Sequence, residues 1–233
     1  MLRTTIKCLG VIRERNIVSN IEAGNFSERM RAAISLCWVM FSRKVGNGLI
    51  PINKEASMQL QYAYVLQQLL PLITFHNDEK FEIELETGVK SNGRRREIDL
   101  LFSGEFGNQK HIIAIEMKCY RTLAASGGKR GATDIFMKDV YEDLHLLEQY
   151  VSQGIAQEGV ALVMNDMERL VNPSGKEAKC WDYDISHGAS FGPGQLTTPI
   201  GGKEITIKLS KKYYFSWINY GSFWFLEAQG ENV

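Results

Sequence analysis

The chain lacks the marks of several large protein classes. Its four cysteines, Cys8, Cys37, Cys119 and Cys180, are too far apart for a C-x-x-C pair, which excludes a zinc ribbon and a thioredoxin-like motif. No stretch approaches the roughly 18 apolar residues of a membrane span, and Met1–Asn20 lacks the apolar core of a signal peptide. We therefore expect a cytoplasmic protein with free thiols and no membrane partner.

A net charge is absent as well. Lys and Arg total 27, and Asp and Glu total 27, among 233 residues. This balance excludes a uniformly basic nucleic-acid binder, but it leaves a local basic patch open, because binding grooves need clustered charge rather than net charge. The sequence contains neither a Walker loop nor a G-x-G-x-x-G fingerprint, so nothing in it indicates an energy-coupled enzyme.

Apolar residues at helical spacing predict three helices. These helices are expected over Asn25–Phe41, Lys54–Leu70 and Thr133–Gln153. Asn25 and Glu28 resemble a capping box at the first start, and Asn53 and Thr133 are the expected N-caps of the other two. Pro71 is expected to follow the end of the second helix.

Strands are predicted from period-two alternation or from short apolar runs. The four central strands are expected over Phe81–Gly88, Glu97–Ser103, His111–Cys119 and Gly159–Met164. Beyond Asp166, a polar stretch runs to Gly202. Strand-like segments there and in the tail are Lys179–Ile185, Lys203–Leu209, Tyr213–Tyr220 and Ser222–Leu226.

The order of the middle elements is helix, three strands, helix, strand, which predicts an α/β fold with a mixed central sheet flanked by helices. We expect a single domain over residues 1–233. It would consist of an N-terminal helical segment (1–53), a core (54–166), and a loop and β-rich C-terminal elaboration (167–233).

Three charged residues stand out because they adjoin strongly apolar strands. Glu116 and Lys118 end the run Ile112–Ile115 and share one face of their strand, where idle charges are costly. A two-residue turn at Gly107-Asn108 would pair Asp99 directly with Glu116. Directly opposed side chains have Cβ atoms about 4.5–5.5 Å apart. Two carboxylates this close suit a hard divalent cation such as Mg²⁺.

Asp99 followed by Glu116-x-Lys118, between a helix that carries Glu55 and a later helix and strand, resembles the PD-(D/E)XK nuclease superfamily. This superfamily includes restriction endonucleases and many repair and phage nucleases. The resemblance covers about half of the chain, residues 54–166, and implies a restriction endonuclease-like nuclease core. The proline of the family signature is absent, because Ile98 precedes Asp99, and this proline is commonly replaced in the family.

The resemblance implies metal-dependent hydrolysis of a phosphodiester. Asp99, Glu116 and Glu55 would be metal ligands for Mg²⁺, with Mn²⁺ as a substitute, and Lys118 would position or activate the attacking water. All four are therefore the predicted catalytic residues. A structural ion-pair cluster is the alternative for Asp99, Glu116 and Lys118. Glu55 is also favoured at a helix start by the helix dipole alone.

Two basic groups flank this constellation in the sequence. The first lies between two expected strands and the second follows Lys118. We predict that they contact nucleic-acid phosphates, and a solubilising loop is the alternative. The groups are Arg94, Arg95 and Arg96, and Arg121, Lys129 and Arg130. Weaker candidates for the site are Gln59, Tyr62, Glu84, Glu86 and the basic and aromatic run Lys211–Tyr214.

The function expected from these residues is a DNA endonuclease of restriction or defence type. Two alternatives stay open: an RNA-directed nuclease on the same scaffold, and a non-catalytic nucleic-acid- or protein-binding module that keeps the fold. Restriction-type members often dimerise to cut both strands, so a homodimer is a further expected partner.

Overall fold

The computed structural model describes residues 19–22, 24–123, 127–202 and 204–233. Some expected features fall outside these ranges. They are residues 1–18 of the N-terminal segment, residues 124–126 of the loop after Lys118, and Lys203 at the start of an expected tail strand.

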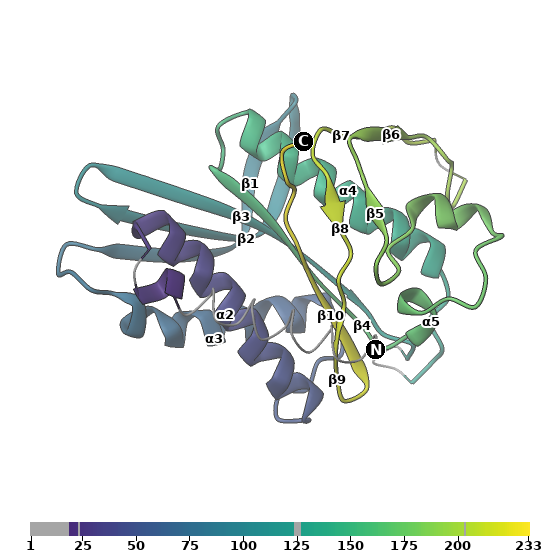
Figure 1. The fold of residues 1–233 in the computed structure, drawn as a ribbon, viewed down its shortest axis with the longest axis horizontal. Coiled ribbons are helices and arrows are strands. Elements are labelled where there is room, and N and C mark those ends of the chain that lie inside the picture. The colour runs from purple at the N-terminus through teal and green to yellow at the C-terminus, as the bar shows by residue number, and fades with distance from the viewer. Residues whose placement is uncertain (1–18, 23, 124–126, 203) are drawn as a thin grey trace.

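A six-stranded mixed sheet lies at the centre of the structure (Figure 1), with the strand order β1-β2-β3-β4-β10-β9. Neighbouring strands are antiparallel except β3 and β4, which are parallel and joined through the helix α4 (Thr133–Ser152). The strands are β1 (Lys80–Ser91), β2 (Arg94–Phe106), β3 (Gln109–Tyr120), β4 (Glu158–Asn165), β9 (Ile218–Tyr220) and β10 (Phe223–Ala228). The expected α/β class and mixed sheet are confirmed.

Helices cover both faces of this sheet. α2 (Phe26–Gly46) and α3 (Glu55–Ile73) pack on one face, and α4 packs on the other together with the C-terminal segments (Figure 1). Those segments are α5 (Glu168–Val171), the 3₁₀-helix η1 (Lys179–Tyr183), β5 (Ser190–Phe191), β6 (Gly194–Leu196), β7 (Ile207–Leu209) and β8 (Tyr213–Tyr214).

The two first helices differ in how well the sequence predicts their ends. Asn25 and Glu28 form the expected capping box on α2, but the helix continues past Phe41 because Val45 is still buried on its inner face. α3 begins after Lys54 rather than Asn53, so the prediction of Asn53 as N-cap was wrong. The reason is Ser57, whose hydroxyl accepts from the backbone N–H groups of both residues.

Two other boundary predictions were also wrong. Pro71 lies inside the last turn of α3, because the buried Ile73 beyond it offsets the one backbone hydrogen bond that a proline removes. At α4, Ala132 takes the N-cap position in a left-handed conformation and Thr133 is the first helical residue.

The β2–β3 hairpin has the predicted register. Phe106 pairs with Gln109 around the two-residue turn, and the ladder runs on to Leu100 and Ile115. This pairing leaves Asp99 and Glu116 as the next two opposed residues. The ladder ends here because the Asp99 carboxylate, rather than a backbone carbonyl, accepts the N–H of Met117, with 2.6 Å between N and Oδ2.

The β1–β2 hairpin corrects the placement of the first basic group. Asn92 and Gly93, with φ of 47° and 76°, form a two-residue turn that pairs Ser91 with Arg94. Arg94, Arg95 and Arg96 therefore belong to β2 rather than to a connecting loop. Asn-Gly is a strong hairpin signal because both turn residues need positive φ, and this signal was missed.

The C-terminal region also differs from its prediction. Lys179–Ile185 is not a strand but forms η1 and the residues after it, and its alternating Trp181, Tyr183 and Ile185 are buried beside α4. Tyr213–Tyr220 divides into β8 and β9, and only Ile207–Leu209 of the preceding segment is a strand. Two of the six central strands, β9 and β10, thus come from residues 167–233.

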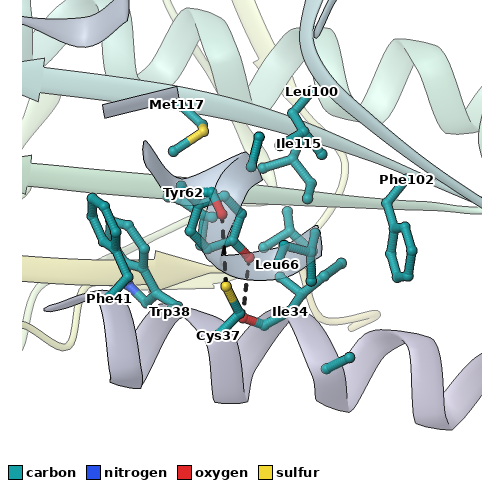
Figure 2. Close-up of a cluster of buried hydrophobic side chains, with 14 of the residues drawn as sticks. Ile34, Cys37, Trp38, Phe41, Tyr62, Leu66, Leu100, Phe102, Ile115 and Met117 are labelled. Carbon is teal, nitrogen blue, oxygen red and sulfur yellow. Dashed lines mark hydrogen bonds between the residues drawn. The ribbon is translucent and has the colours of Figure 1, made fainter. Parts of the chain in front are cut away.

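A tightly packed core fills the space between α2, α3 and the sheet (Figure 2). Tyr62 and Leu66 project from α3 into it and are fully buried. The Tyr62 hydroxyl donates to the backbone carbonyl of Ile34 on α2, and the Cys37 thiol donates to the carbonyl of Tyr62. Tyr62 is therefore a core residue that ties the two helices together.

Within the described ranges, no helix combines the length and the apolar character that crossing a bilayer requires.

Cys37, Cys119 and Cys180 carry free thiols, and Cys8 lies outside the described residues.

Replacement of Leu66 by alanine tests the importance of the core. Because Leu66 is fully buried, Leu66→Ala is expected to lower the free energy of unfolding by about 2–5 kcal/mol. Leu60→Ala, on the same helix but 59% exposed, is the matched control and should change it by less than about 0.5 kcal/mol. Urea denaturation followed by circular dichroism measures both. Equal losses in the two variants would contradict the described packing.

Candidate active site

Strand β3 separates its apolar and charged side chains between two faces of the sheet. Ile113, Ile115 and Met117 pack in the core beneath α2 and α3. The alternate residues Glu116 and Lys118 point to the α4 side, where Ala114 belongs to the second buried cluster. Because side chains alternate along a strand, the end of β3 places two ionisable groups, Glu116 and Lys118, under α4.

Strand β2 changes its facing just before Asp99. Leu100 and Phe102 pack on the α2 and α3 side, but Ile98 packs on the α4 side, so these three residues do not share one face. The ladder with β1 lacks one pair between Leu85–Leu100 and Thr87–Ile98, where Glu86 has a φ of 52°. This irregularity turns the beginning of β2, including Arg94 and Arg96, toward α4.

Asp99 and Glu116 are neighbouring carboxyl groups. Burial raises the pKa of Asp99, and its hydrogen bond from Met117 partly opposes that rise. Glu116 is only 5% exposed, and its Oε1 has no hydrogen-bond partner among the described residues. Burial, followed by the charges of Asp143 and Asp99, raises the pKa of Glu116 well above its usual range. An orphaned carboxylate oxygen in this setting needs a proton or a cation.

Lys118 lies between carboxylates on opposite sides. Its Nζ is 3.3 Å from Oδ2 of Asp143 and 3.6 Å from Oε1 of Glu55. Burial acts to lower the pKa of Lys118, but the charges of Asp143, Glu55 and Asp99 outweigh burial and raise it. The ammonium therefore stays protonated and serves as a fixed positive charge rather than as a proton acceptor.

Glu55 reaches the site from the first turn of α3. Its Oε2 accepts the backbone N–H of Cys119 at 3.3 Å, while its Oε1 faces Lys118. Burial raises the pKa of Glu55, and Lys118 partly offsets this. The structure therefore brings together all four predicted catalytic residues, Asp99, Glu116, Lys118 and Glu55, although Glu55 is directed at Lys118 and β3. Burial raises the pKa of the adjacent Cys119 thiol to about 12, which leaves it unreactive.

Asp143 of α4 is a member of this site that sequence reasoning missed. It is buried, and burial raises its pKa to about 8 even though Lys118 lowers it. The sequence did contain a signal. Asp143 lies among Phe136, Val140 and Leu147 on the buried stripe of α4, where a charge is expensive unless it has a partner.

The site therefore holds four carboxyl groups around one ammonium. They belong to Glu55, Asp99, Glu116 and Asp143, and all four have raised pKa values. In the described part of the chain, no three His, Cys, Asp or Glu side chains are grouped as metal ligands. The pair Asp99 and Glu116 nevertheless fits a hard cation, because two oxygen donors meet and Oε1 of Glu116 accepts no hydrogen bond from the described residues. The Tyr150 hydroxyl also lies near Glu116, and burial, followed by the charge of Glu116, raises the pKa of Tyr150.

A cleft of about 690 Å³ opens beside this cluster over α4. Lys118 and Asp143 belong to its lining, and Arg94 and Arg96 of β2 also line it. Glu204–Thr206 and Ile207, the first residue of β7, line it as well. Only part of the first basic group therefore faces the cleft, because Arg95 alternates to the opposite face of the hairpin, beside Gly88.

The second basic group occupies a different environment. The guanidinium of Arg121 is held by Asp166 at 2.9 Å and by the carbonyl of Ile52, and it lies over the ring of Phe223. These contacts tie β3 to the rest of the fold. Lys129 and Arg130 follow in the loop, where Lys129 forms a β-bridge with Leu123 and the Arg130 backbone N–H bonds to Thr122.

The weaker candidates are mostly distributed elsewhere. Glu84 is exposed and accepts a hydrogen bond from Thr87, while Gln59 is buried in α3. Glu86 contributes a like charge that helps to raise the pKa of Asp99. In the Lys211–Tyr214 run, the Lys211 backbone N–H and the Tyr213 hydroxyl donate to Glu148 of α4, which gives this run a structural role.

The segment Gly188–Gly192 also fits the serine-hydrolase pattern G-x-S-x-G. Ser190 begins the short strand β5, which is followed by β6 rather than by a helix. The strand-to-helix turn that exposes such a serine is therefore not formed at this position.

Comparison of the chain with protein-family models, with curated proteins and with solved structures finds no match. The arrangement of the side chains around Lys118 is therefore the basis for assigning a function.

The raised pKa values predict a pH-dependent stability. Asp143 has an ordinary pKa of 3.8 and a folded pKa of about 8, so the folded chain binds more protons than the unfolded chain between these values. The free energy of unfolding should then fall as pH rises through this window. Glu116→Gln removes a buried carboxyl group that must keep a proton in the folded chain but not in the unfolded one, and in metal-free buffer at about pH 8 it should raise that free energy by about 1 kcal/mol or more.

Thermal unfolding in EDTA checks this expectation, since 1 kcal/mol corresponds to roughly 2–4 °C in Tm for a chain of this size. The gain should be much smaller at about pH 4.5, where the wild-type carboxyls are protonated. Glu105→Gln, at an exposed position on β2, is the control and should change Tm little at either pH. An equal gain for Glu116→Gln at both pH values would contradict the electrostatic explanation.

Proposed function

We propose that the chain is a metal-dependent nuclease of the PD-(D/E)XK type that hydrolyses phosphodiester bonds, with DNA as its substrate. The observation that carries this proposal is the meeting of Asp99, Glu116 and Lys118 on the α4 side of the sheet, where Oε1 of Glu116 lacks a partner. A buried group of this composition is expensive to maintain as a purely structural feature.

The topology supports the proposed restriction endonuclease-like core. α3 precedes the antiparallel meander β1-β2-β3, and the crossover through α4 returns β4 parallel to β3. This is the helix, three strands, helix and strand order on which the resemblance rests. Glu55 at the start of α3 and the trio on β2 and β3 occupy the corresponding elements.

In this proposal, Asp99 and Glu116 hold Mg²⁺, with Mn²⁺ as a substitute, and Glu55 is the further expected ligand. The ion, when bound, supplies activation of water and shielding of negative charge on the phosphate. Lys118 contributes a fixed positive charge that orients the water or stabilises the charge that develops on the phosphoryl oxygens. Asp143 and Glu55 contact the Lys118 ammonium from two sides and fix its position.

A role in restriction or defence, as a homodimer that cuts both strands, is the more specific form of the proposal. RNA as the substrate and a non-catalytic binding module are the alternatives. Both are resolved by the two experiments that follow, because the first compares substrates and the second measures metal binding without requiring cleavage.

Removal of the Lys118 ammonium should abolish cleavage. With Mg²⁺ or Mn²⁺, Lys118→Ala is expected to lower the cleavage rate by about 100-fold or more, since it removes an electrostatic group at the reacting phosphate. Lys110→Ala, at the opposite and exposed end of β3, is the matched control and should cut at the wild-type rate. Gel assays on plasmid, linear, single-stranded DNA and RNA measure the rates. Cleavage that survives in a folded Lys118→Ala variant would contradict the assignment.

Metal binding should depend on the carboxylate pair. Calorimetric titration is expected to show Mn²⁺ binding to the wild-type chain and its loss in the double variant Asp99→Asn/Glu116→Gln. Glu105→Gln should bind Mn²⁺ as the wild type does, because that side chain lies far along β2 and is exposed. A wild-type chain that binds no Mn²⁺ would instead favour the non-catalytic module.

A further inference from the structure

Two alternate residues of β2, Arg94 and Arg96, give the cleft over α4 a basic surface, which we call the basic wall. Arg94 and Arg96 line the cleft together with Lys118. Val89, which pairs with Arg96, packs on the α4 side. Arg95 pairs with Lys90 and points to the other face of the hairpin. Three consecutive arginines therefore divide into two that face the candidate site and one that does not.

The two cleft-facing guanidinium groups are not engaged within the fold. Among the described residues, the side chains of Arg94 and Arg96 form no hydrogen bond or ion pair, and both residues are exposed. Arg29, Arg31 and Arg121, in contrast, are each paired with a carboxylate. A guanidinium presents a rigid fork of donors that matches phosphate oxygens, so unengaged arginines in a cleft suit a phosphate ligand.

A chain of polar contacts holds this basic wall in place. Gln149 of α4 accepts a hydrogen bond from the buried Ser91 at the end of β1, and Gln153 bonds to both Ser91 and the backbone N–H of Asn92. His145 connects Gln149 to the carbonyl of Lys208 in β7. The hairpin tip and β7, which lie on two sides of the cleft, are thus both fastened to α4. The backbone that carries Arg94 and Arg96 is therefore held against α4, while their exposed guanidinium groups keep the freedom to adjust to a ligand.

The other residues of the lining limit which parts of a nucleic acid the cleft can contact. Asp139, Glu142 and Glu204 are the acidic residues of the lining away from the reacting cluster, and Lys138 pairs with Asp139 at 2.8 Å and with Glu142 at 2.6 Å. No Phe, Tyr or Trp belongs to the lining, and the imidazole of His145, which does, is held by Gln149 and by the carbonyl of Lys208. The cleft therefore lacks the series of aromatic platforms on which successive bases stack. Its contacts with nucleic acid are then to the sugar-phosphate backbone, which carries no base sequence.

We propose that Arg94 and Arg96, but not Arg95, bind the phosphate backbone of one nucleic-acid strand in this cleft and lead it to Lys118 without regard to base sequence. This inference rests on the proposed nuclease function. It adds that Arg94 and Arg96 bind the substrate and that they do so through its phosphates. The direction is given by the hairpin, because Arg94 lies near its tip and Arg96 lies nearer to Asp99 along β2.

The test measures binding separately from cleavage. Fluorescence anisotropy of a labelled single-stranded DNA is recorded in EDTA, where metal-dependent cutting cannot occur, over a range of salt concentrations. Each lost phosphate contact on a single strand should reduce the slope of log K against log salt by about 0.7. Arg94→Ala/Arg96→Ala should therefore lower the slope by about 1.4 and weaken binding by roughly tenfold or more at low salt.

Arg95→Ala is the matched control, since it removes the same charge from the same run on the opposite face and should leave slope and affinity unchanged. Two strands of equal length and unrelated sequence should bind the wild type with equal affinity within about twofold. The conservative variant Arg94→Lys/Arg96→Lys should keep the slope, because it keeps the charges. Thermal unfolding of every variant verifies that the fold persists.

The outcomes separate this inference from the proposed function. Binding that depends on Arg94 and Arg96 in a chain that cuts no substrate would support the inference and contradict the nuclease. If the wild type cleaves a substrate but Arg94→Ala/Arg96→Ala binds DNA as tightly as the wild type, the result would support the nuclease and contradict the inference. An equal effect of Arg95→Ala, a marked preference for one sequence, or no binding by the wild type would overturn the inference.

Discussion

The antiparallel pairing of β2 with β3 is the constraint on which the candidate site depends. The two-residue turn between Phe106 and Gln109 sets the register, and the register makes Asp99 and Glu116 opposed residues. A shift by one residue would send one of the carboxylates to the other face of the sheet. The hydrogen bond from Met117 to Asp99 holds this end of the hairpin where the backbone ladder stops. The position of the site therefore depends on the register of the β2–β3 hairpin, which brings Asp99 and Glu116 together.

The same placement gives the site an electrostatic cost. Glu116 and Lys118 are carried under α4 by the end of β3, where the alternate residues Ile115 and Met117 are fully buried, and α4 adds Asp143 to the group. Four carboxyl groups with raised pKa values surround one ammonium, so the folded chain retains protons that the unfolded chain has released. Such an arrangement exchanges stability for a strong attraction toward cations, which is the property that a metal-dependent phosphodiesterase uses.

Residues far from this hairpin complete its surroundings. β10 and β9, from the end of the chain, extend the sheet beyond β4. Glu204–Ile207 form a side of the cleft, and Glu148 of α4 fastens the following residues by accepting hydrogen bonds from Ser210, Lys211 and Tyr213. The C-terminal region is thus a structural part of the cleft, not an addition beside it. β10 is held by its pairing with β4, while the shorter elements η1, β7 and β8 contribute to the buried cluster that contains α4.

The α/β class, the β2–β3 register and the trio of Asp99, Glu116 and Lys118 are all predicted from the sequence, because a two-residue turn and period-two alternation are local properties. The remaining features depend on contacts between distant parts of the chain. The apolar stripe of α4 marks Asp143 as a buried charge, but only the packing of α4 on β3 shows that its partner is Lys118. The facing of β2 separates Arg95 from Arg94 and Arg96. β10 joined β4 from more than fifty positions along the chain, a pairing that no local pattern encodes. Long-range packing determines which side chains meet, since the residues involved are neighbours in space but not in the chain.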